Sequence, residues 1–323
     1  MDITKQMQHD PFHAGEQQLQ EKYGSRATLS QHGHRIIHTE LTQEHQLFFQ
    51  SLSYVAFASV DESGRLRSTL LCAETGFITV MSPDKLILQL PEHEIQLVSH
   101  LQTGDQIALL GIDFSNRRRN RVNGWISLLE HSCLHIEVKQ AFGNCPKYIQ
   151  QRSLSDICDT TQGNIHAPLQ RLNQLSAKMQ SIINKADTSF IASHYPCKTS
   201  KSDRDCGADI SHRGGYPGFI NVIDAKTLMI PDYSGNRFFN TLGNIIANPA
   251  VSLLIVDFEN GHLLQLSGQF QINHGPVEKH WPQGAERLLE FSLEEAELRQ
   301  NVLPTHWQLE NYSPFLELSH SND

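Results

Sequence analysis

The sequence predicts a mainly β protein in which two tandem barrels follow an N-terminal helical arm. In two stretches, short apolar runs alternate with tight turns, which is typical of small closed or partly closed barrels. The stretches also repeat one another. Gly76-Phe-Ile-x-Val matches Gly218-Phe-Ile-x-Val, and Leu109-Leu110-x-x-Asp113-Phe114 matches Leu253-Leu254-x-x-Asp257-Phe258. At 323 residues the chain is long enough for two such domains, and we interpret the repeat as a tandem duplication.

Residues 1–50 form the predicted arm. Gly15–Tyr23 has the pattern of a short amphipathic helix. A second helix is expected over Thr42–Gln50, where Thr42 is a suitable N-cap residue. Arms of this kind pack across a neighbouring domain or subunit.

Residues 51–150 form the first predicted barrel. Turn signals at Asp61–Gly64 and Ser82–Asp84 each separate two apolar runs and so predict two hairpins. Glu92–Gln102 is expected to be helical. The basic run Arg117–Arg119 with Arg121 is interpreted as an exposed loop between two later strands.

Residues 151–186 are predicted to be a linker and residues 187–323 the second barrel. Apolar residues at helical spacing predict a helix over His166–Asn184, with Pro168 in its first turn. The strand pattern returns at Thr188, and Arg287–Glu295 alternates like a last strand. Leu303–Trp307 is expected to pack on the outside.

Composition narrows the class of protein. The net charge of −9 argues against nucleic-acid binding, and no run approaches the roughly 18 apolar residues of a membrane span. The polar N-terminus has no signal-peptide core, so we expect a cytoplasmic protein. The cysteines form no CxxC pair and are expected to be reduced thiols. They are Cys72, Cys133, Cys145, Cys158, Cys197 and Cys206. The spacing His194-x2-Cys197-x8-Cys206-x5-His212 suggests zinc, but it spans a very polar segment, and we predict no metal site.

The stretch Gly207–Asn248 contains most of the candidate site. Asp232-Tyr-Ser-Gly-Asn236-Arg237 lies at a strand-to-helix junction, where helix N–H groups and a guanidinium group can bind a phosphate. Arg237 and Asn240 could instead cap the helix, and Asp232 could be a turn residue. Ser211-His212-Arg213 precedes two glycines that allow close approach of a ligand, although His212 and Arg213 could be a surface pair.

Two further residues are candidates. Gln265 lies in an apolar strand, where a buried amide needs a partner that could be a ligand or the backbone. Lys147 follows the first barrel and could either reach the site or belong to the linker. In the first repeat, Leu90–Ile95 aligns with Asp232–Arg237 but has two carboxylates and no arginine, and Arg121 aligns with Gln265. We therefore predict one phosphate site, in the second barrel, with the first barrel as a wall.

Several motifs together resemble a known family. They are Phe12-His13-x-Gly15-Glu16, Gly143-Asn-Cys-Pro-Lys-Tyr-Ile149, Ser211-His-Arg-Gly-Gly215, Asn236-Arg-x-x-Asn-Thr-Leu-Gly-Asn244 and Asn248-Pro-Ala-Val-Ser-Leu-Leu254. The second half resembles the FMN-binding split barrel of pyridoxamine 5′-phosphate oxidase. The whole chain resembles bacterial flavin-nucleotide-binding proteins related to that enzyme. The resemblance implies two tandem FMN-binding split barrels.

The resemblance also implies roles for individual residues. Ser211, His212 and Arg213 would contact the flavin and its phosphate, Arg237 would hold the phosphate, and Gln265 would meet the edge of the ring. Phe238 stands where the oxidases have a second basic residue, which Arg213 or Lys147 could replace. The C-terminal Arg-x-His pattern of the oxidases is missing, which argues against pyridoxamine-phosphate oxidation itself.

The functional hypothesis from the sequence is an FMN-dependent oxidoreductase. Its substrate would be an unidentified small molecule or redox partner protein, and its catalytic residues are unknown. The alternatives are a flavin- or phosphate-cofactor-binding module without turnover and a haem-handling split-barrel protein. We expect a homodimer, because the flavin of the single-barrel oxidases lies between two subunits.

Overall fold

The first barrel is a seven-stranded antiparallel sheet in the computed structural model, which describes residues 10–61, 63–157, 169–197, 206–274, 282–303 and 305–318. Its strand order is β2-β1-β5-β6-β7-β4-β3. The strands are β1 (Tyr54–Val60), β2 (Leu66–Cys72), β3 (Ile78–Ser82), β4 (Lys85–Gln89), β5 (Gln106–Asp113), β6 (Arg118–Glu130) and β7 (Cys133–Asn144).

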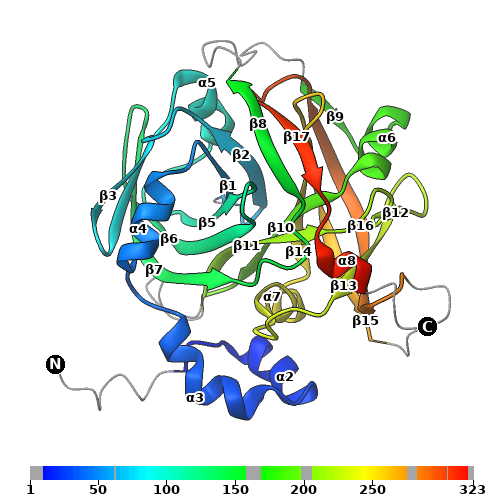
Figure 1. Cartoon of the computed structure of the whole chain (residues 1–323), viewed down its shortest axis with the longest axis horizontal. Coiled ribbons are helices and arrows are strands. Elements are labelled where there is room, and N and C mark those ends of the chain that lie inside the picture. Colours follow the sequence, from blue (N-terminus) through cyan, green and yellow to red (C-terminus); the bar gives the residue numbers. More distant parts are fainter. Residues whose placement is uncertain are drawn as a thin grey trace.

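The second barrel repeats this arrangement. Its order is β11-β10-β14-β15-β16-β13-β12, with β9 (Leu169–Leu172) added beside β16. The strands are β10 (Thr188–Tyr195), β11 (Gly207–Gly214), β12 (Asn221–Val222), β13 (Thr227–Tyr233), β14 (Ala250–Asp257), β15 (His262–Asn273) and β16 (Ala285–Arg299). Figure 1 shows the two barrels side by side.

The barrels correspond strand by strand and also in local detail. Leu110 pairs with Arg121 in the first barrel, and Leu254 pairs with Gln265 in the second. Each barrel has a β-bulge at an equivalent glycine, Gly124 or Gly268, where an added Cβ would lie 2.1 Å from a backbone oxygen of the next strand. The predicted fold class, mainly β with two tandem barrels and a helical arm, is confirmed by this topology.

The two barrels share a buried interface. In β1, Val55 and Phe57 belong to the core of the first barrel, whereas Ala56 and Ala58 face the second barrel. The same division holds in β5, β10 and β14. These strands are therefore buried on both faces, which is why they appear in the sequence as continuous apolar runs.

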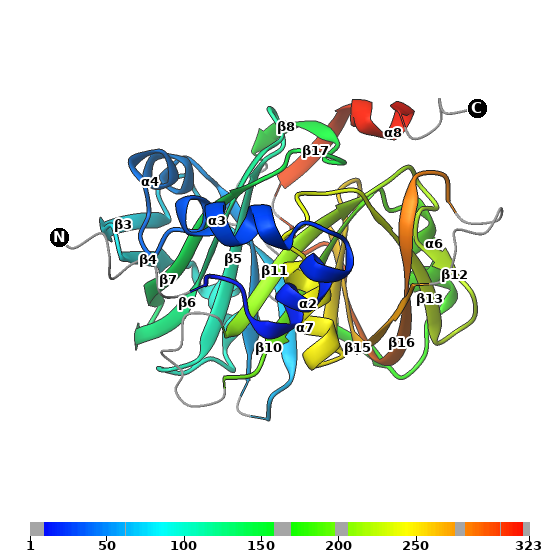
Figure 2. The same ribbon diagram turned by 90° about the horizontal axis from the view of Figure 1, so that it is seen from below.

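The N-terminal arm covers one end of this interface (Figure 2). It consists of α2 (Ala14–Lys22), α3 (Arg26–Ile36) and α4 (Gln43–Gln50), and Thr42 caps α4 as predicted. Helix α2 packs against α7 (Asn240–Ala247) of the second barrel. The approach is close enough that a Cβ on Gly15 would lie 2.2 Å from the oxygen of Gly243.

The connection between the barrels differs from the prediction. The single helix expected over His166–Asn184 is wrong, because Leu169–Leu172 pairs with β16 as β9 and the helix α6 spans only Ala177–Lys185. Strand β8 (Gln151–Ile157) pairs with β17 (Thr305–Asn311) in a separate two-stranded sheet that lies over the junction of the two barrels, at the top of Figure 2. Leu303 and Trp307, expected to pack on the outside of the barrel, lie outside the two barrel sheets and pack against them with 8% and 6% exposure. A last helix, α8, spans Pro314–Leu318.

Two further expectations are corrected in the first barrel. The helix expected over Glu92–Gln102 is shorter, with α5 at Glu92–Ile95 and a 3-10 turn, η1, at Gln96–Val98. Of the arginine run expected in an exposed loop, Arg117 does lie in the turn before β6, but Arg118, Arg119 and Arg121 belong to that strand.

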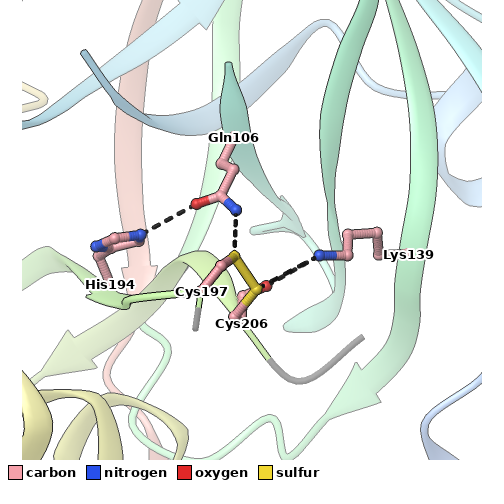
Figure 3. Close-up of a disulfide and its surroundings, with 5 residues drawn as sticks. All are labelled: Gln106, Lys139, His194, Cys197 and Cys206. Atoms are coloured by element: carbon pink, nitrogen blue, oxygen red, sulfur yellow. Dashed lines mark hydrogen bonds between the residues drawn. A yellow bond between two sulfur atoms is a disulfide. The ribbon is translucent and has the colours of Figure 1, made fainter. Parts of the chain in front are cut away.

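The expectation of reduced cysteines is wrong for one pair. Cys197 and Cys206 form a disulfide with a Cα–Cα distance of 5.0 Å (Figure 3). The pairing of β10 with β11 brings Tyr195 opposite Gly207 and so places the two cysteines side by side. Spacing alone does not reveal this proximity. Cys72, Cys133 and Cys145 are free thiols, and Cys158 lies outside the described residues.

None of the helices in the described part of the chain has the length and hydropathy needed to cross a bilayer. Within the same ranges, His, Cys, Asp and Glu form no group of three or more that could hold a metal ion.

The bulge glycines offer a test of the barrel correspondence. Replacing Gly124 or Gly268 with alanine should destabilise the protein by about 1–3 kcal/mol in each case, because a backbone carbonyl must move. Urea unfolding measures the change. Gly143→Ala is the matched control, since its Cβ would meet only a side-chain oxygen at 3.4 Å. Two bulge variants as stable as the control would contradict the prediction.

Candidate functional site

The main candidate site is a cavity of about 100 Å³ between the barrels, here called the arginine pocket. The first barrel contributes Arg119, Arg121 and Asn144. The second contributes Ser211, Arg213, Asp232, Tyr233, Gly235, Asn236, Arg237, Phe239, Asn240, Thr241, Leu242, Glu286 and Arg287. Five arginines thus surround the pocket with only two carboxylates.

Arg121 connects the barrels at the floor of the pocket. It projects from β6, is 3% exposed, and forms an ion pair of 2.7 Å with Asp209 of β11. Its Nη2 donates to Ser211 Oγ at 2.6 Å, and Thr241 Oγ1 donates to the same hydroxyl at 2.7 Å. Arg121 Nη1 also donates to Asn240 Oδ1 at 3.3 Å. The first barrel therefore holds both β11 and the start of α7 in place.

Positive charge is crowded at this point. Arg119 lies two residues before Arg121 on the same face of β6. Burial, together with the charges of Arg121 and Arg213, lowers the pKa of Arg119 to about 9. Burial also lowers the pKa of Arg121, although Asp209 opposes this effect. A bound anion would relieve the repulsion between these side chains.

Asp232 is the main counter-charge on the opposite wall. It accepts from Nε of Arg287 at 2.7 Å and forms a longer ion pair of 3.4 Å with Arg213. Arg287 is 3% exposed, and its guanidinium lies 4.7 Å from the ring centre of Tyr23 in the arm. Asp232 therefore interacts more strongly with Arg287 than with Arg213, because its contact with Arg287 is shorter.

The segment between β13 and α7 forms the mouth of the pocket. Arg237 and Phe239 have φ values of 61° and 64°, a region that bulky residues rarely occupy. Phe239 is the N-cap of α7 but makes no side-chain cap hydrogen bond. Such strain persists only where the surroundings impose it, and it is frequent at ligand sites. The start of α7 therefore presents uncapped N–H groups at the pocket.

The arm holds this strained segment from outside. Gln20 Nε2 donates to the oxygen of Phe238 at 3.1 Å, and Arg237 Nη1 donates to the oxygen of Tyr23 at 3.4 Å. Asn240 Nδ2 donates to Glu16. The arm residues therefore determine the shape of the pocket mouth without lining it.

Glu16 is a buried carboxyl group in this contact. It is 4% exposed, and Glu16 Oε2 accepts from the backbone N–H of His13 at 2.8 Å. Burial raises the pKa of Glu16 to about 8, so the carboxyl is mostly protonated at neutral pH. His13 Nε2 in turn lies 2.8 Å from Asn244 Oδ1, and Asn244 Nδ2 donates to Ser193 Oγ at 2.9 Å.

His212 and Lys147 lie in an adjoining pocket. It shares Arg119, Arg213 and Asp232 with the arginine pocket, and Cys145 and Tyr148 also line it. His212 is 3% exposed, and burial, followed by nearby arginines, lowers its pKa well below the usual value, so it is neutral. Lys147 Nζ lies 5.2 Å from the ring centre of Phe315.

Gln265 does not line the arginine pocket or the pocket beside it. It lines a separate cavity with Arg67, His100 and Arg299, and its Oε1 accepts from the backbone N–H of Ser68 at 3.3 Å. The barrel correspondence explains this position. Each barrel sends the equivalent residue across the interface, so Arg121 reaches β11 and Gln265 reaches β2. The residue facing the arginine pocket is therefore Arg121.

The structure thus brings together six of the nine predicted residues in one pocket and two more beside it. The sequence interpretation missed Arg119, Arg121 and Arg287. A signal for the first two was present, because Arg119, Arg121 and Asn123 alternate as a strand face does. Arg287 had no such signal, since only the pairing of β13 with β16 places it opposite Asp232.

Comparisons with known proteins concern the barrel fold. No family model matches the chain, and no curated protein matches it. HupZ of Group A Streptococcus is similar over 37% of this chain and 90% of its own, with 16% identity and a TM-score of 0.29. A candidate pyridoxamine 5′-phosphate oxidase from Lactobacillus delbrueckii covers 39% of this chain and 94% of its own, with 15% identity and a TM-score of 0.29.

A third solved structure belongs to a protein from Clostridium acetobutylicum that is related to general stress protein 26, of the pyridoxinephosphate oxidase family. It covers 41% of this chain and 92% of its own, with 12% identity and a TM-score of 0.27. The fold itself is established by the strand order and register described above.

The ion pair between the barrels should be costly to break from one side. Asp209→Asn leaves Arg121 buried without its nearest counter-charge and should lower the free energy of unfolding by about 3–5 kcal/mol. The double variant Arg121→Met with Asp209→Leu should recover much of that loss. Urea unfolding of the three proteins measures both effects. A double variant no more stable than Asp209→Asn would show that the pair is not the source of the loss.

Glu16 should make stability depend on pH. Its pKa of about 8 in the folded protein exceeds the ordinary value of 4.5, so the folded state retains a proton that the unfolded chain releases. This contribution is complete below pH 4.5 and is lost as pH rises through 8. The wild-type free energy of unfolding should therefore fall relative to Glu16→Gln by at most about 1.4 kcal/mol per pH unit in that window. Urea unfolding measures these free energies. If the wild type and Glu16→Gln show the same pH dependence from pH 4.5 to 8.5, the raised pKa of Glu16 is refuted.

Proposed function

We propose that this protein binds FMN with its phosphate in the arginine pocket and acts as a flavin-dependent oxidoreductase. The observation that carries the proposal is a set of unpaired donors. Arg119 Nε, Arg121 Nε, Arg213 Nε and Arg287 Nη1 are buried and have no hydrogen-bond partner among the described residues. Buried donors without partners are costly, and a phosphate group supplies several acceptor oxygens.

The donor set fits a phosphate better than a carboxylate. Five guanidinium groups and the uncapped start of α7 approach the cavity from different elements. A helix N-terminus and arginine forks together favour an anion with several oxygens. Asp232 neutralises Arg287 more than Arg213, so Arg213 and Arg237 are the side chains best able to turn toward a ligand.

A ligand larger than phosphate would also contact the adjoining pocket of His212 and Lys147. That pocket shares Arg213, Asp232 and Tyr233 with the arginine pocket, and Tyr148 also lines it. The rings of Tyr148 and Tyr233 stack with centres 5.1 Å apart, which gives that side an aromatic wall suited to a flat ring system. Two of the motifs that resemble the oxidase family, Gly143–Ile149 and Ser211–Gly215, contribute residues to this pocket.

Each residue would then have a limited task. Arg213, Arg237 and the first N–H groups of α7 would hold the phosphate, while Arg121 and Ser211 would keep β11 and α7 at the correct separation. When bound, the flavin would supply hydride or electron transfer. Both walls of the pocket come from one chain, so a homodimer, which we still expect, would not be required to complete it.

A non-catalytic flavin-binding module is the second candidate. It is favoured by the fact that Asp232, a carboxylate of the pocket wall, is held by Arg287 and so is poorly placed for proton transfer. Reduction of the bound flavin by NADH or NADPH, followed by reoxidation with oxygen or a quinone, separates the two. Absence of any reduction across such donors would favour the module.

Phosphate recognition can be tested with two ligands. Arg213→Ala and Arg237→Ala should each weaken FMN binding by about 1.5–3 kcal/mol, or roughly 10- to 150-fold. Quenching of flavin fluorescence measures the affinity. Riboflavin, which has no phosphate, should bind more weakly to the wild type and respond little to either substitution. Arg65→Ala is the control, because Arg65 is exposed and pairs with Glu295 away from the pocket.

The result that would overturn the proposal is also specific. A wild-type protein that binds neither flavin would end it. Equal affinities of FMN and riboflavin in all variants would show that the arginines do not read the phosphate.

A further inference from the structure

The disulfide Cys197–Cys206 lies at the loop end of the β10–β11 hairpin, and the two sulfur atoms have different surroundings (Figure 3). Both cysteines are half-buried, so solvent reaches the pair in part. Three residues from other positions in the sheets approach them: Lys139 of β7, Gln106 of β5 and His194 of β10. This pair lies outside the arginine pocket and plays no part in the proposed function.

Lys139 is placed at Cys206. Its Nζ lies 3.8 Å from Cys206 Sγ and donates to the oxygen of the same residue at 3.3 Å. The lysine is only 6% exposed, and its ammonium group lies 5.8 Å from the ring centre of Trp125. A nearby cation hardly changes the free energy of a neutral disulfide, whereas it strongly stabilises a thiolate. The position of Lys139 therefore favours the reduced, ionised form of Cys206.

Cys197 has a neutral partner instead. Gln106 Nε2 donates to Cys197 Sγ at 2.8 Å, and Gln106 Oε1 lies 3.0 Å from His194 Nε2. Burial lowers the pKa of His194 to about 4, so the ring is neutral and donates its Nε2–H to the amide oxygen. His194 is thus a positioning residue that turns the amide group of Gln106 toward the sulfur.

We propose that Cys197 and Cys206 form a reversible thiol–disulfide exchange site whose co-reactant is a dithiol reductant. Lys139 makes Cys206 the better leaving group and the more acidic thiol of the pair. The positive charge of Lys139 lies at Cys206, whereas the amide of Gln106 at Cys197 is neutral.

Reduction of the disulfide takes place in two thiol–disulfide exchange steps. A thiolate of the reductant attacks Cys197 Sγ, the bond between the two protein sulfurs breaks, and its electron pair goes to Cys206 Sγ beside Lys139. The second thiol of the reductant loses its proton and attacks the mixed disulfide, which releases Cys197. The reductant is oxidised to its disulfide by two electrons. Cys197 takes up one proton, and Cys206 remains a thiolate. A low-pKa leaving group accelerates the first step.

A purely structural role explains less of this environment. The cysteines are nine residues apart, so the disulfide closes a short loop, where the loss of chain entropy in the unfolded state is smallest. The charged Lys139 lies at one sulfur and the neutral Gln106 at the other. This difference is expected where one sulfur must carry negative charge.

The test follows individual thiols in the full-length protein. After equilibration with reduced and oxidised dithiothreitol, acid trapping and differential alkylation with peptide mass spectrometry give the redox state of each cysteine. Cys197 and Cys206 should interconvert fully and reversibly while the protein stays folded. In the reduced protein, the pH dependence of iodoacetamide alkylation should give Cys206 a midpoint between about 3.5 and about 7.5, below that of Cys197.

Variants of Lys139 test whether its charge lowers the alkylation midpoint of Cys206. Lys139→Met should raise the Cys206 midpoint by about one pH unit or more, whereas Lys139→Arg should keep it low because the charge is retained. Lys85→Met, at an exposed lysine of β4, is the control for loss of a positive charge elsewhere. Circular dichroism checks that each variant is folded.

Three results would overturn the proposal. One is a pair that stays oxidised in excess dithiothreitol while the protein is folded. The second is a Cys206 midpoint at or above about 8.5, the ordinary value for a cysteine. The third is a midpoint that does not respond to Lys139→Met in a folded variant.

Discussion

The buried contact of Arg121 with Asp209 and Ser211 is the interaction on which the rest of the site depends. It joins β6 of the first barrel to β11 of the second and, through Asn240 and Thr241, to the start of α7. A buried arginine needs a counter-charge and acceptors for its donors. Asp209, Ser211 and Asn240 supply them for both Nη atoms of Arg121, while its Nε has no partner among the described residues. The packing of the two barrels therefore determines where β11 and α7 can lie, and with them the width of the arginine pocket.

Equivalent positions in the two barrels carry side chains of different charge. Leu110 pairs with Arg121 and Leu254 with Gln265, so a charged group crosses the interface on one side and a neutral amide on the other. The cavity at Gln265 contains Arg67 and Glu297 as partners at 3.9 Å, whereas the arginine pocket retains unpaired donors. The same architecture thus produces one strongly cationic pocket and one that is largely compensated. This asymmetry is the reason to assign an anion to only one of them.

The fold was predictable because its signals are local. Alternating apolar runs, turn residues and the offset between Gly76 and Gly218 all follow from the order of residues along the chain. The grouping of side chains around the arginine pocket was predictable where they are close in the sequence, as with Ser211 and Arg213 or along Asp232–Arg237. It was not predictable where strands distant in sequence meet. Arg287 faces Asp232 only through the pairing of β13 with β16, and Gln265 was assigned to the wrong side because the direction of crossing depends on the interface.

The arm adds a constraint of a different kind. Backbone strain at Arg237 and Phe239 costs of the order of 1–3 kcal/mol per residue, and the contacts of Gln20, Tyr23 and Glu16 offset it. Gly15 and Glu16 belong to the motif Phe12-His13-x-Gly15-Glu16, one of those on which the family resemblance rests. Their contacts with Gly243 and Asn240 place this motif against α7 of the second barrel. A pocket mouth held in a strained conformation is already shaped before a ligand arrives, so less binding energy is spent on ordering it.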